Sequence, residues 1–227
     1  VFDLDNRIMD VNYLNNYSGA PAYTWVPNHP KLQYRPRDAF VVQYDPSVWY
    51  NDPDGLRVGL KLDRVYLGDR RQMRFNLWYG AKSRELDYDV SYGNRLYTIL
   101  PQLRYNLRSA TIAGRQWNEI RLSLRWWRGW ELLPKTTVAV GFRNIALTDN
   151  SYPLTPWDPG VNNQLFASLE YEFRGFDWYG DLSGEVVTAQ QFLRSEFGFT
   201  TLTVEWNHEE HRLGSLTVYS RVFGGVS

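Results

Sequence analysis

The chain has 227 residues, enough for one large all-β domain, and it carries 25 basic and 25 acidic residues. This balance excludes the basic field that a nucleic-acid partner requires, so we expect no such partner. The absence of cysteine excludes a disulfide framework and cysteine–zinc sites. No apolar run approaches the roughly 18 residues of a transmembrane helix.

Residues 1–38 do not alternate in the way that a strand does. They are rich in Asn, Pro and Tyr, with prolines at positions 21, 27, 30 and 36. We interpret this segment as an extended N-terminal arm outside the main fold, whose aromatic side chains pack on another surface. A disordered leader is the alternative interpretation.

From residue 39 onward, apolar and polar residues alternate with a period of two, which is typical of a strand with one apolar and one polar face. The first expected strands cover 39–50, 56–66 and 72–81. Between the first two, 51–55 reads Asn-Asp-Pro-Asp-Gly, which is a turn composition.

The clearest alternation lies in the middle of the chain, at 85–92, 97–108 and 119–127. The first two of these runs are separated by Gly-Asn-Arg at 93–95, which predicts a tight turn. Five further strands are expected from the same pattern, at 136–146, 164–174, 178–187, 197–207 and 213–223. The total is about eleven strands, each near the ~9–11 residues that a tilted strand needs to cross a bilayer.

Alternation alone fits either a soluble barrel with an apolar interior or a membrane barrel with its apolar face toward lipid. Three features favour the membrane: uniformly long strands, aromatic residues near strand ends, and a polar face with both signs of charge. The aromatic residues are Trp49, Tyr50, Trp78, Tyr79, Trp117, Trp126, Trp127, Trp130, Tyr171, Trp178 and Tyr179. The lumen-facing charged candidates are Arg74, Asp87, Asp89, Arg104, Glu119, Arg121, Arg125, Glu170, Glu172, Glu185, Glu205 and Arg221.

We therefore predict an all-β fold: an antiparallel up-and-down transmembrane β-barrel of about 11–12 strands at 39–227. The expected location is the outer membrane of a Gram-negative bacterium. Links after the second, fourth, eighth and tenth expected strands are short, whereas those after the fifth, seventh and ninth are longer. Because short turns of such barrels face the periplasm, the arm at 1–38 is expected to be periplasmic. Single-chain barrels usually have an even strand number. We therefore expect one strand more than the pattern shows within the chain, strands after 227, or a partner that closes the wall.

One stretch near the N-terminus, 4–16 (Leu-Asp-Asn-Arg-Ile-Met-Asp-Val-Asn-Tyr-Leu-Asn-Asn), resembles a segment of a known family. It is similar to the junction after the catalytic part of large M1-family (gluzincin) metallopeptidase-like proteins of Gram-negative bacteria. Residues 49–60, 77–80 and 216–225 are similar to the outer-membrane barrel that follows in those proteins. The resemblance implies a barrel that tethers or accompanies a periplasmic peptidase domain and that continues past 227. It implies no catalysis here, because the peptidase's zinc motif is absent.

Motifs for metal or cofactor binding are weak, and we expect no metal site and no cofactor. His208 and His211 are three residues apart, whereas a zinc peptidase helix needs two His four apart around a Glu. We interpret 208–211 as a solvated charged turn. The segment 52–55 begins like a calcium loop but has no Glu at the far end, so we interpret it as a plain turn.

The expected function is that of a membrane anchor or assembly subunit for a periplasmic or surface complex, without catalysis in this chain. The expected partners are the lipid bilayer and other protein subunits or a missing flanking domain. Three alternatives stay open: a channel or transport barrel, a membrane-embedded hydrolase, and a soluble β-barrel that binds an apolar ligand. The hydrolase would use carboxylate pairs that share a face, Asp87 with Asp89 or Glu170 with Glu172. Balance against nearby arginines is the competing interpretation of those pairs.

Overall fold

The computed structural model describes residues 22–28, 39–66, 70–96, 99–100, 102–127, 134–149, 160–175, 178–211 and 217–226. Within these ranges the protein is all-β, as predicted, and its one short helix is the 3-10 turn η2 (Gln191–Leu193). Among the same residues, no helix is both long and apolar enough to cross a membrane.

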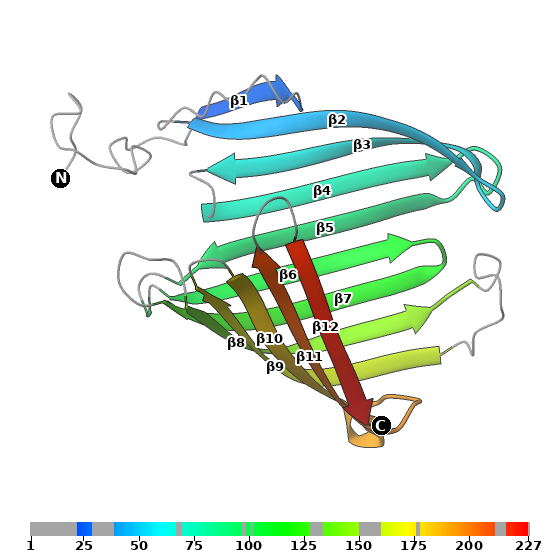
Figure 1. Cartoon of the computed structure of the whole chain (residues 1–227). Coiled ribbons are helices and arrows are strands. Elements are labelled where there is room, and N and C mark those ends of the chain that lie inside the picture. Colours follow the sequence, from blue (N-terminus) through cyan, green and yellow to red (C-terminus); the bar gives the residue numbers. More distant parts are fainter. Residues whose placement is uncertain are drawn as a thin grey trace, which may run out of the picture. The chain divides into compact units, whose positions relative to one another are not determined.

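The strands follow the chain from β1 to β12 (Figure 1). They are β1 (Ala22–Pro27), β2 (Ala39–Asn51), β3 (Gly55–Tyr66), β4 (Arg70–Gly80), β5 (Leu86–Arg95), β6 (Leu103–Ile112), β7 (Arg115–Trp127), β8 (Lys135–Leu147), β9 (Gly160–Arg174), β10 (Trp178–Ala189), β11 (Phe199–His211) and β12 (Thr217–Val226).

The strands form one sheet in which each strand is hydrogen-bonded to its neighbours in sequence, from β1 to β12. The sheet is mixed, because a strand of the predicted arm at 1–38 joins it in parallel; this corrects the prediction that the arm lies outside the main fold. β1, which lies inside the predicted arm, pairs in parallel with the first half of β2, so that Ala22 faces Ala39 and Pro27 faces Tyr44. Over the described residues the order has two ends, β1 and β12, and the sheet is not closed into a barrel.

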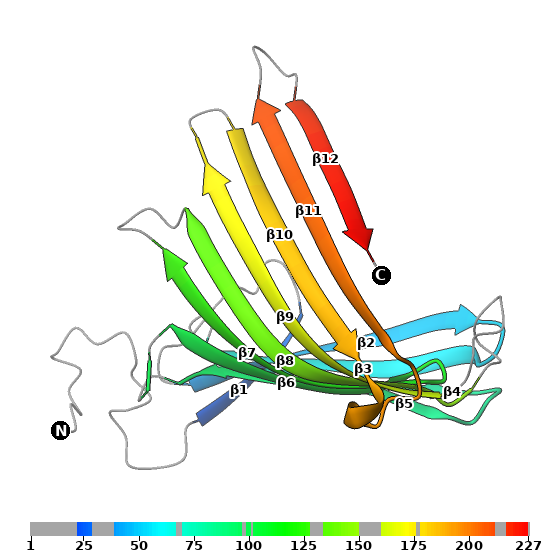
Figure 2. The same cartoon turned by 90° about the horizontal axis from the view of Figure 1, so that it is seen from below.

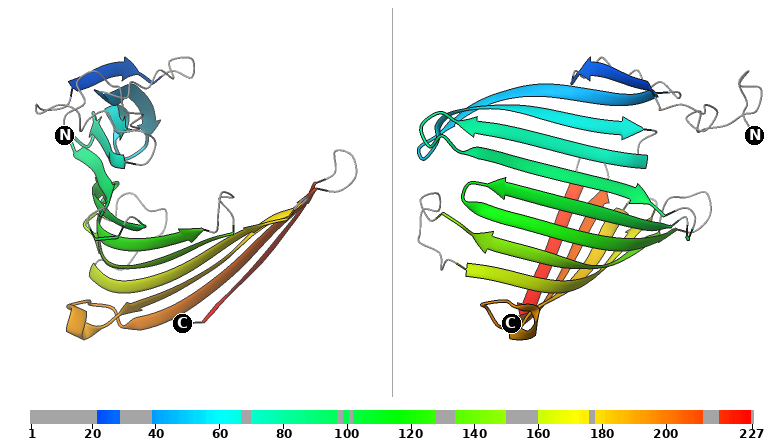
Figure 3. Two further views of the ribbon diagram at one scale, coloured as in Figure 1. Left: turned by 90° about the vertical axis from the view of Figure 1, so that its left-hand side faces the viewer. Right: turned by 180° about the vertical axis from the view of Figure 1, so that it is seen from behind.

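The chain divides into two compact units. The first unit comprises Val1–Asn94, Leu107–Arg115 and Asp149–Pro156, and the second comprises Arg95–Asn106, Gln116–Thr148 and Trp157–Ser227. In the first unit, β2, β3, β4 and β5 form antiparallel hairpins, and the β2–β3 and β4–β5 turns lie at the same end of the strands (Figure 3, right).

In the second unit, β8 to β12 form an antiparallel row with continuous register (Figure 2). Val138 faces Leu169, Leu182 faces both Tyr171 and Trp206, and Trp206 faces Val222, so apolar residues of adjacent strands share one face. Opposed side chains on one face of an antiparallel pair lie within contact distance, which makes such rows the unit of sheet stabilisation.

Two turns differ from the sequence prediction. The expected turn at 93–95 is still strand, and β6 begins at Leu103 instead of residue 97. The amides of Ile99 and Leu100 donate to the carbonyl of Leu96, which forms a local turn before β6. The link after the fifth expected strand is not long: it is the two residues Ala113 and Gly114, with φ of 51° and 73°. Two consecutive positive φ values are typical of a type I′ hairpin turn.

Burial is inverted relative to a soluble sheet. The buried hydrophobic residues among those described are few and mostly small: Ala39, Phe40, Val41, Val42, Ala110, Ala139, Ala146, Phe166 and Ala189. Charged and amide side chains that are buried include Asp54, Arg57, Asn76, Asp87 and Gln164. Soluble proteins almost never bury Arg or Asp while their large aliphatic residues stay exposed. Many large apolar positions of the alternation are therefore exposed in both units, and several polar positions are buried.

Candidate functional site

The apolar positions of the strands are exposed in each unit. In the first unit these are Leu56, Val58, Leu60, Met73, Tyr79 and Leu86. In the second unit they include Ile120, Leu122, Val140, Phe142, Leu165, Leu169, Leu182, Val186, Leu202 and Val204. We call these positions the apolar face. Exposed patches of this extent on monomeric proteins mark contacts with another protein or with a membrane.

The length of the apolar face along one strand fits a bilayer. On β9 the face runs from Leu165 through Leu169 and Tyr171 to Phe173. Eight residue steps of a strand span about 27 Å, and a strand tilt of about 40° reduces this to roughly 20 Å. The apolar band of an outer-membrane barrel is ~25 Å tall, so the dimensions agree within one row of residues.

The two ends of the apolar face differ in the second unit. One end carries a row of touching rings: Tyr171 to Phe173 at 5.7 Å, Phe173 to Trp178 at 5.4 Å, Trp178 to His208 at 6.1 Å and His208 to Trp206 at 5.5 Å. The other end carries side-chain amides, with Asn118 donating to Asn144 and Asn144 donating to Asn163. Aromatic rows at the limit of an apolar band are typical of membrane barrels.

In the first unit, each predicted lumen residue on β4 and β5 has an oppositely charged partner. Arg74 donates to Asp63 at 2.8 Å across β3 and β4. Asp89 accepts two hydrogen bonds from Arg108, at 3.0 and 2.9 Å. Asp87 is paired with Arg57. The predicted pair Asp87 and Asp89 is therefore tied up in two separate ion pairs, and it does not form an isolated acid–base couple.

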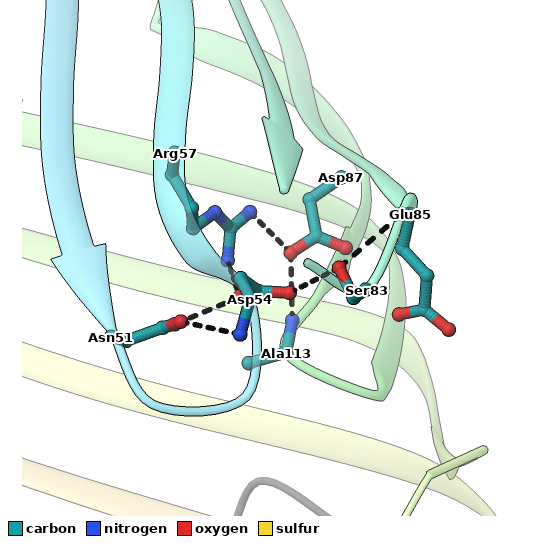
Figure 4. A network of polar contacts seen from close by, with 7 residues as sticks. All are labelled: Asn51, Asp54, Arg57, Ser83, Glu85, Asp87 and Ala113. Atoms are coloured by element: carbon teal, nitrogen blue, oxygen red, sulfur yellow. Dashed lines mark hydrogen bonds and ion pairs between the residues drawn. The ribbon is translucent and has the colours of Figure 1, made fainter. Parts of the chain in front are cut away.

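The Arg57 pair is the centre of a buried network that we call the turn clasp: Asn51, Asp54, Arg57, Ser83, Asp87 and the amide of Ala113 (Figure 4). Arg57 donates to Asp54 at 2.9 Å and to Asp87, and its side chain is 1% exposed. The guanidinium also lies 4.7 Å from the Trp49 ring. A charge this deeply buried is tolerated only when it is paired and hydrogen-bonded.

The turn clasp joins three turns of the first unit. Asp54 accepts from Asn51 at 2.8 Å within the β2–β3 turn and from the Ser83 hydroxyl at 2.7 Å in the β4–β5 turn. Asp87 accepts from the amide of Ala113 at 3.0 Å, in the turn after β6. A Cβ at Gly80 would stand 2.4 Å from the Ser83 hydroxyl and 2.9 Å from Asp54, so glycine permits this close approach. The clasp thereby fixes the positions of these turns.

In the second unit, the predicted residues form a ladder of pairs around Arg143, which we call the Arg143 ladder. Arg143 donates to Glu119 at 2.9 Å and lies 3.7 Å from Glu185. Its guanidinium is 4.7 Å from the centre of both the Trp117 and the Phe166 ring.

The other charged residues of the second unit that were predicted to face the lumen lie at separate polar positions of the strands. Arg121 donates to the Ser168 hydroxyl at 3.4 Å. Glu172 pairs with Lys135, and Glu205 accepts from Arg221 at 2.9 Å. Glu170 faces Thr137 on β8 and Ser183 on β10, one row from Glu172 on the same face. Arg104 and Arg125 are half-buried on β6 and β7.

A pocket of about 290 Å³ lies on β10, β11 and β12, lined by Tyr179, Gly180, Asp181, Asn207, His208, Glu209, Ser220 and Arg221. Asn207 donates to Asp181 at 3.1 Å and to Glu205 at 3.0 Å, so polar groups at its wall satisfy one another. His208 faces Ser220 in its wall, and the Nδ1 of His208 has no hydrogen-bond partner. Across the described residues, no group of three or more His, Asp or Glu side chains could hold a metal ion.

The two weak sequence motifs have structural roles. Residues 208–211 lie in β11 rather than in a turn, and His208 stacks on Trp206. Segment 52–55 is the β2–β3 turn, in which Asp54 serves the turn clasp. Sequence reasoning placed Arg57 on a polar strand position but did not select it, and it missed Asp54 and Arg143. An Arg on a polar strand position two residues after an Asp-Gly turn was the available signal for the clasp.

No protein-family model matches the chain, and no curated protein sequence matches it.

Proposed function

We propose that this chain is part of the wall of an outer-membrane β-barrel of a Gram-negative bacterium. In this proposal it serves as a membrane anchor or assembly subunit for a periplasmic or surface complex and does no catalysis itself. The observation that supports this most directly is the inversion of burial: Leu60 and Val204 are 40% and 43% exposed, while Arg57 is 1% exposed. Lipid is the environment that favours an exposed apolar face and a covered polar one.

Solvent exposure would make the apolar face costly. Each large aliphatic side chain moved out of water gains about 1.5–3 kcal/mol when it is fully buried. Adjacent strands β7 to β11 present such residues in neighbouring rows, so the cost in water would accumulate over the whole face. Lipid contact removes it without any further protein element.

Closure of the wall is part of the proposal. Three strand edges have no partner among the described residues: the outer edges of β1 and β12, and one edge of β2 over Asp45–Asn51, whose other edge pairs with β3. Unpaired backbone amides in hydrocarbon cost several kcal/mol each. The proposal therefore requires these edges to be covered, by pairing with one another, by strands of a longer polypeptide or by a partner subunit.

The anchor role is favoured over a pore because the polar positions are paired with one another. Asp63 with Arg74, Asp89 with Arg108 and Glu119 with Arg143 neutralise the face pair by pair. The resemblance to the barrel that follows M1-family metallopeptidase-like proteins also supports a tethering role. On that resemblance, the complex would contain a periplasmic peptidase domain.

The decisive experiment is a folding test in detergent, liposomes and plain buffer. We expect the chain to show heat-modifiable gel migration only in detergent or lipid, to float with liposomes, and to give no steady conductance in planar bilayers. Folding as a monomer in plain buffer would overturn the membrane proposal and favour a soluble barrel. Steady conductance would favour the channel instead of the anchor.

A further inference from the structure

One cation lies in line with the apolar face of the first unit. On β3 the apolar positions Leu56, Val58, Leu60 and Leu62 are followed, two residues on, by Arg64. Arg64 faces Val42 on β2 and Met73 on β4, and Met73 faces Tyr92 on β5. Arg64 therefore belongs to the row of side chains at the end of the apolar face, one row beyond Leu62.

The guanidinium of Arg64 is held by aromatic rings. It lies 5.1 Å from the centre of the Phe40 ring and 5.8 Å from that of Tyr92. Phe40 is 2% exposed, so one side of the guanidinium is dry. Cation–π contacts orient the planar group without consuming its N–H donors.

Arg64 differs in one respect from Arg57, Arg74 and Arg143. Those three each donate to a carboxylate, whereas no carboxylate pairs with Arg64 within the described ranges. Its Nε is buried and has no hydrogen-bond partner; the Nε of Arg57 is also unpartnered, but the terminal nitrogens of Arg57 are paired with Asp54 and Asp87. A buried, unsatisfied donor of a charged group costs free energy that a suitable acceptor would recover.

The position specifies the acceptor. Eight residue steps separate Leu56 from Arg64, about 27 Å along the strand and roughly 20 Å across a bilayer at a strand tilt of about 40°. Arg64 therefore lies within one row of the level at which a ~25 Å apolar band gives way to headgroups. Phosphate oxygens are the anions at that level, and their geometry matches the guanidinium fork. Aromatic side chains such as Tyr92 favour the same level.

We propose that Arg64, flanked by Phe40 and Tyr92, binds the phosphate of an anionic lipid headgroup at the membrane interface. This site rests on the proposed function, because it requires the apolar face to be in lipid. The apolar face alone would keep the wall in a bilayer whatever the lipid headgroup. The Arg64 site adds a contact with one chemical class of headgroup.

The test is a titration of phosphatidylglycerol into the protein in a non-ionic detergent, followed by native mass spectrometry. Arg64→Gln is compared with the wild type and with Arg74→Gln, which removes the same charge from the adjacent position of β4 on the opposite face. We expect Arg64→Gln to weaken lipid binding about fivefold and Arg74→Gln to leave it unchanged. Equal binding by wild type and Arg64→Gln, or equal losses in both variants, would overturn the site.

Two further arms separate the possible failures. Inorganic phosphate at matched concentration should not displace the lipid; displacement would reassign the site to a free anion and overturn the lipid source. The same preparations are floated with liposomes. If the wild type does not float, both the proposed function and the site fail. If it floats but Arg64→Gln binds lipid normally, the site alone fails.

Discussion

The turn clasp of the first unit and the Arg143 ladder of the second unit rest on the same alternation but satisfy polar positions in different ways. In the first unit, the turn clasp buries Arg57 and two carboxylates almost completely at the strand turns. In the second unit, the Arg143 ladder leaves Arg143 17% exposed and Glu185 39% exposed. The ion pairs are chemically alike, but their side chains differ in exposure to solvent.

This difference separates two uses of charge. A dry, multiply bonded pair is costly to break, because the partner that remains is a buried, unpaired charge. Removal of one member of a pair that water can reach lowers the free energy of unfolding only slightly, since water replaces the partner. We therefore expect the clasp to control the stability of the turns in the first unit and the outer pairs of the second unit to contribute little.

The largest effect is expected from Arg57→Gln, which leaves Asp54 and Asp87 buried without their cation. The free energy of unfolding in detergent, measured by urea titration, should fall by about 3–5 kcal/mol. The matched control is Arg74→Gln, whose side chain is 59% exposed and whose loss should cost about 0–1 kcal/mol. Adding Asp54→Asn and Asp87→Asn to Arg57→Gln should restore part of the loss. Equal costs for the two single variants would remove the contrast between clasp and exposed pair.

The second prediction concerns what the units share. Leu60→Arg in the first unit and Val204→Arg in the second should each destabilise the protein in lipid by about 2–4 kcal/mol, because both place a charge on the apolar face. Thr203→Arg, on the opposite face of β11 and opposite Glu185, is the control and should cost much less. Urea unfolding in liposomes measures all three. A large loss for only one of the two apolar variants would mean that the units do not share one environment.

A smaller effect is expected in the Arg143 ladder. Arg143→Lys keeps the charge but loses the planar group between Trp117 and Phe166, so the free energy of unfolding should fall by about 1–2 kcal/mol. Arg74→Lys, at an exposed position, serves as the control in the same urea titration. A loss as large as that of Arg57→Gln would show that the ladder is as dry as the clasp.

The smallest effect is expected at the far edge of the second unit. Arg221 is 69% exposed and pairs with Glu205. Arg221→Gln should leave the unfolding midpoint unchanged within error, because water replaces the guanidinium. A clear shift of the midpoint would indicate that another protein element covers this edge.

Much of the fold follows from the sequence because the alternation has one period and few interruptions. The segments predicted at 39–50, 56–66 and 136–146 coincide with β2, β3 and β8 to within a residue or so. The predicted start of β6, at 97, was wrong because apolar residues at 97, 99 and 100 extend the alternation. In the structure, the amides of 99 and 100 donate to the carbonyl of Leu96 instead. A period-two pattern contains no information about such local backbone hydrogen bonds.

The partners of each charge were harder to predict. The pattern placed Asp87 on the polar face, yet its partner Arg57 lies thirty positions away in the chain. That contact depends on the exact register of two hairpins and on turns at Asp54 and Ala113, which a period-two pattern leaves open. β1 was missed because its six residues, which follow Pro21 and end at Pro27, carry too few repeats to stand out from an extended arm.

The strand order also has a kinetic consequence. Every strand pairs with its neighbour in sequence. Each new strand therefore forms its hydrogen bonds after the closure of a single connecting loop, so the entropic cost of each step is limited. Such a sheet has low contact order for an all-β protein, and low contact order favours fast folding. Assembly can then proceed hairpin by hairpin, as a zipper, without a search for distant segments.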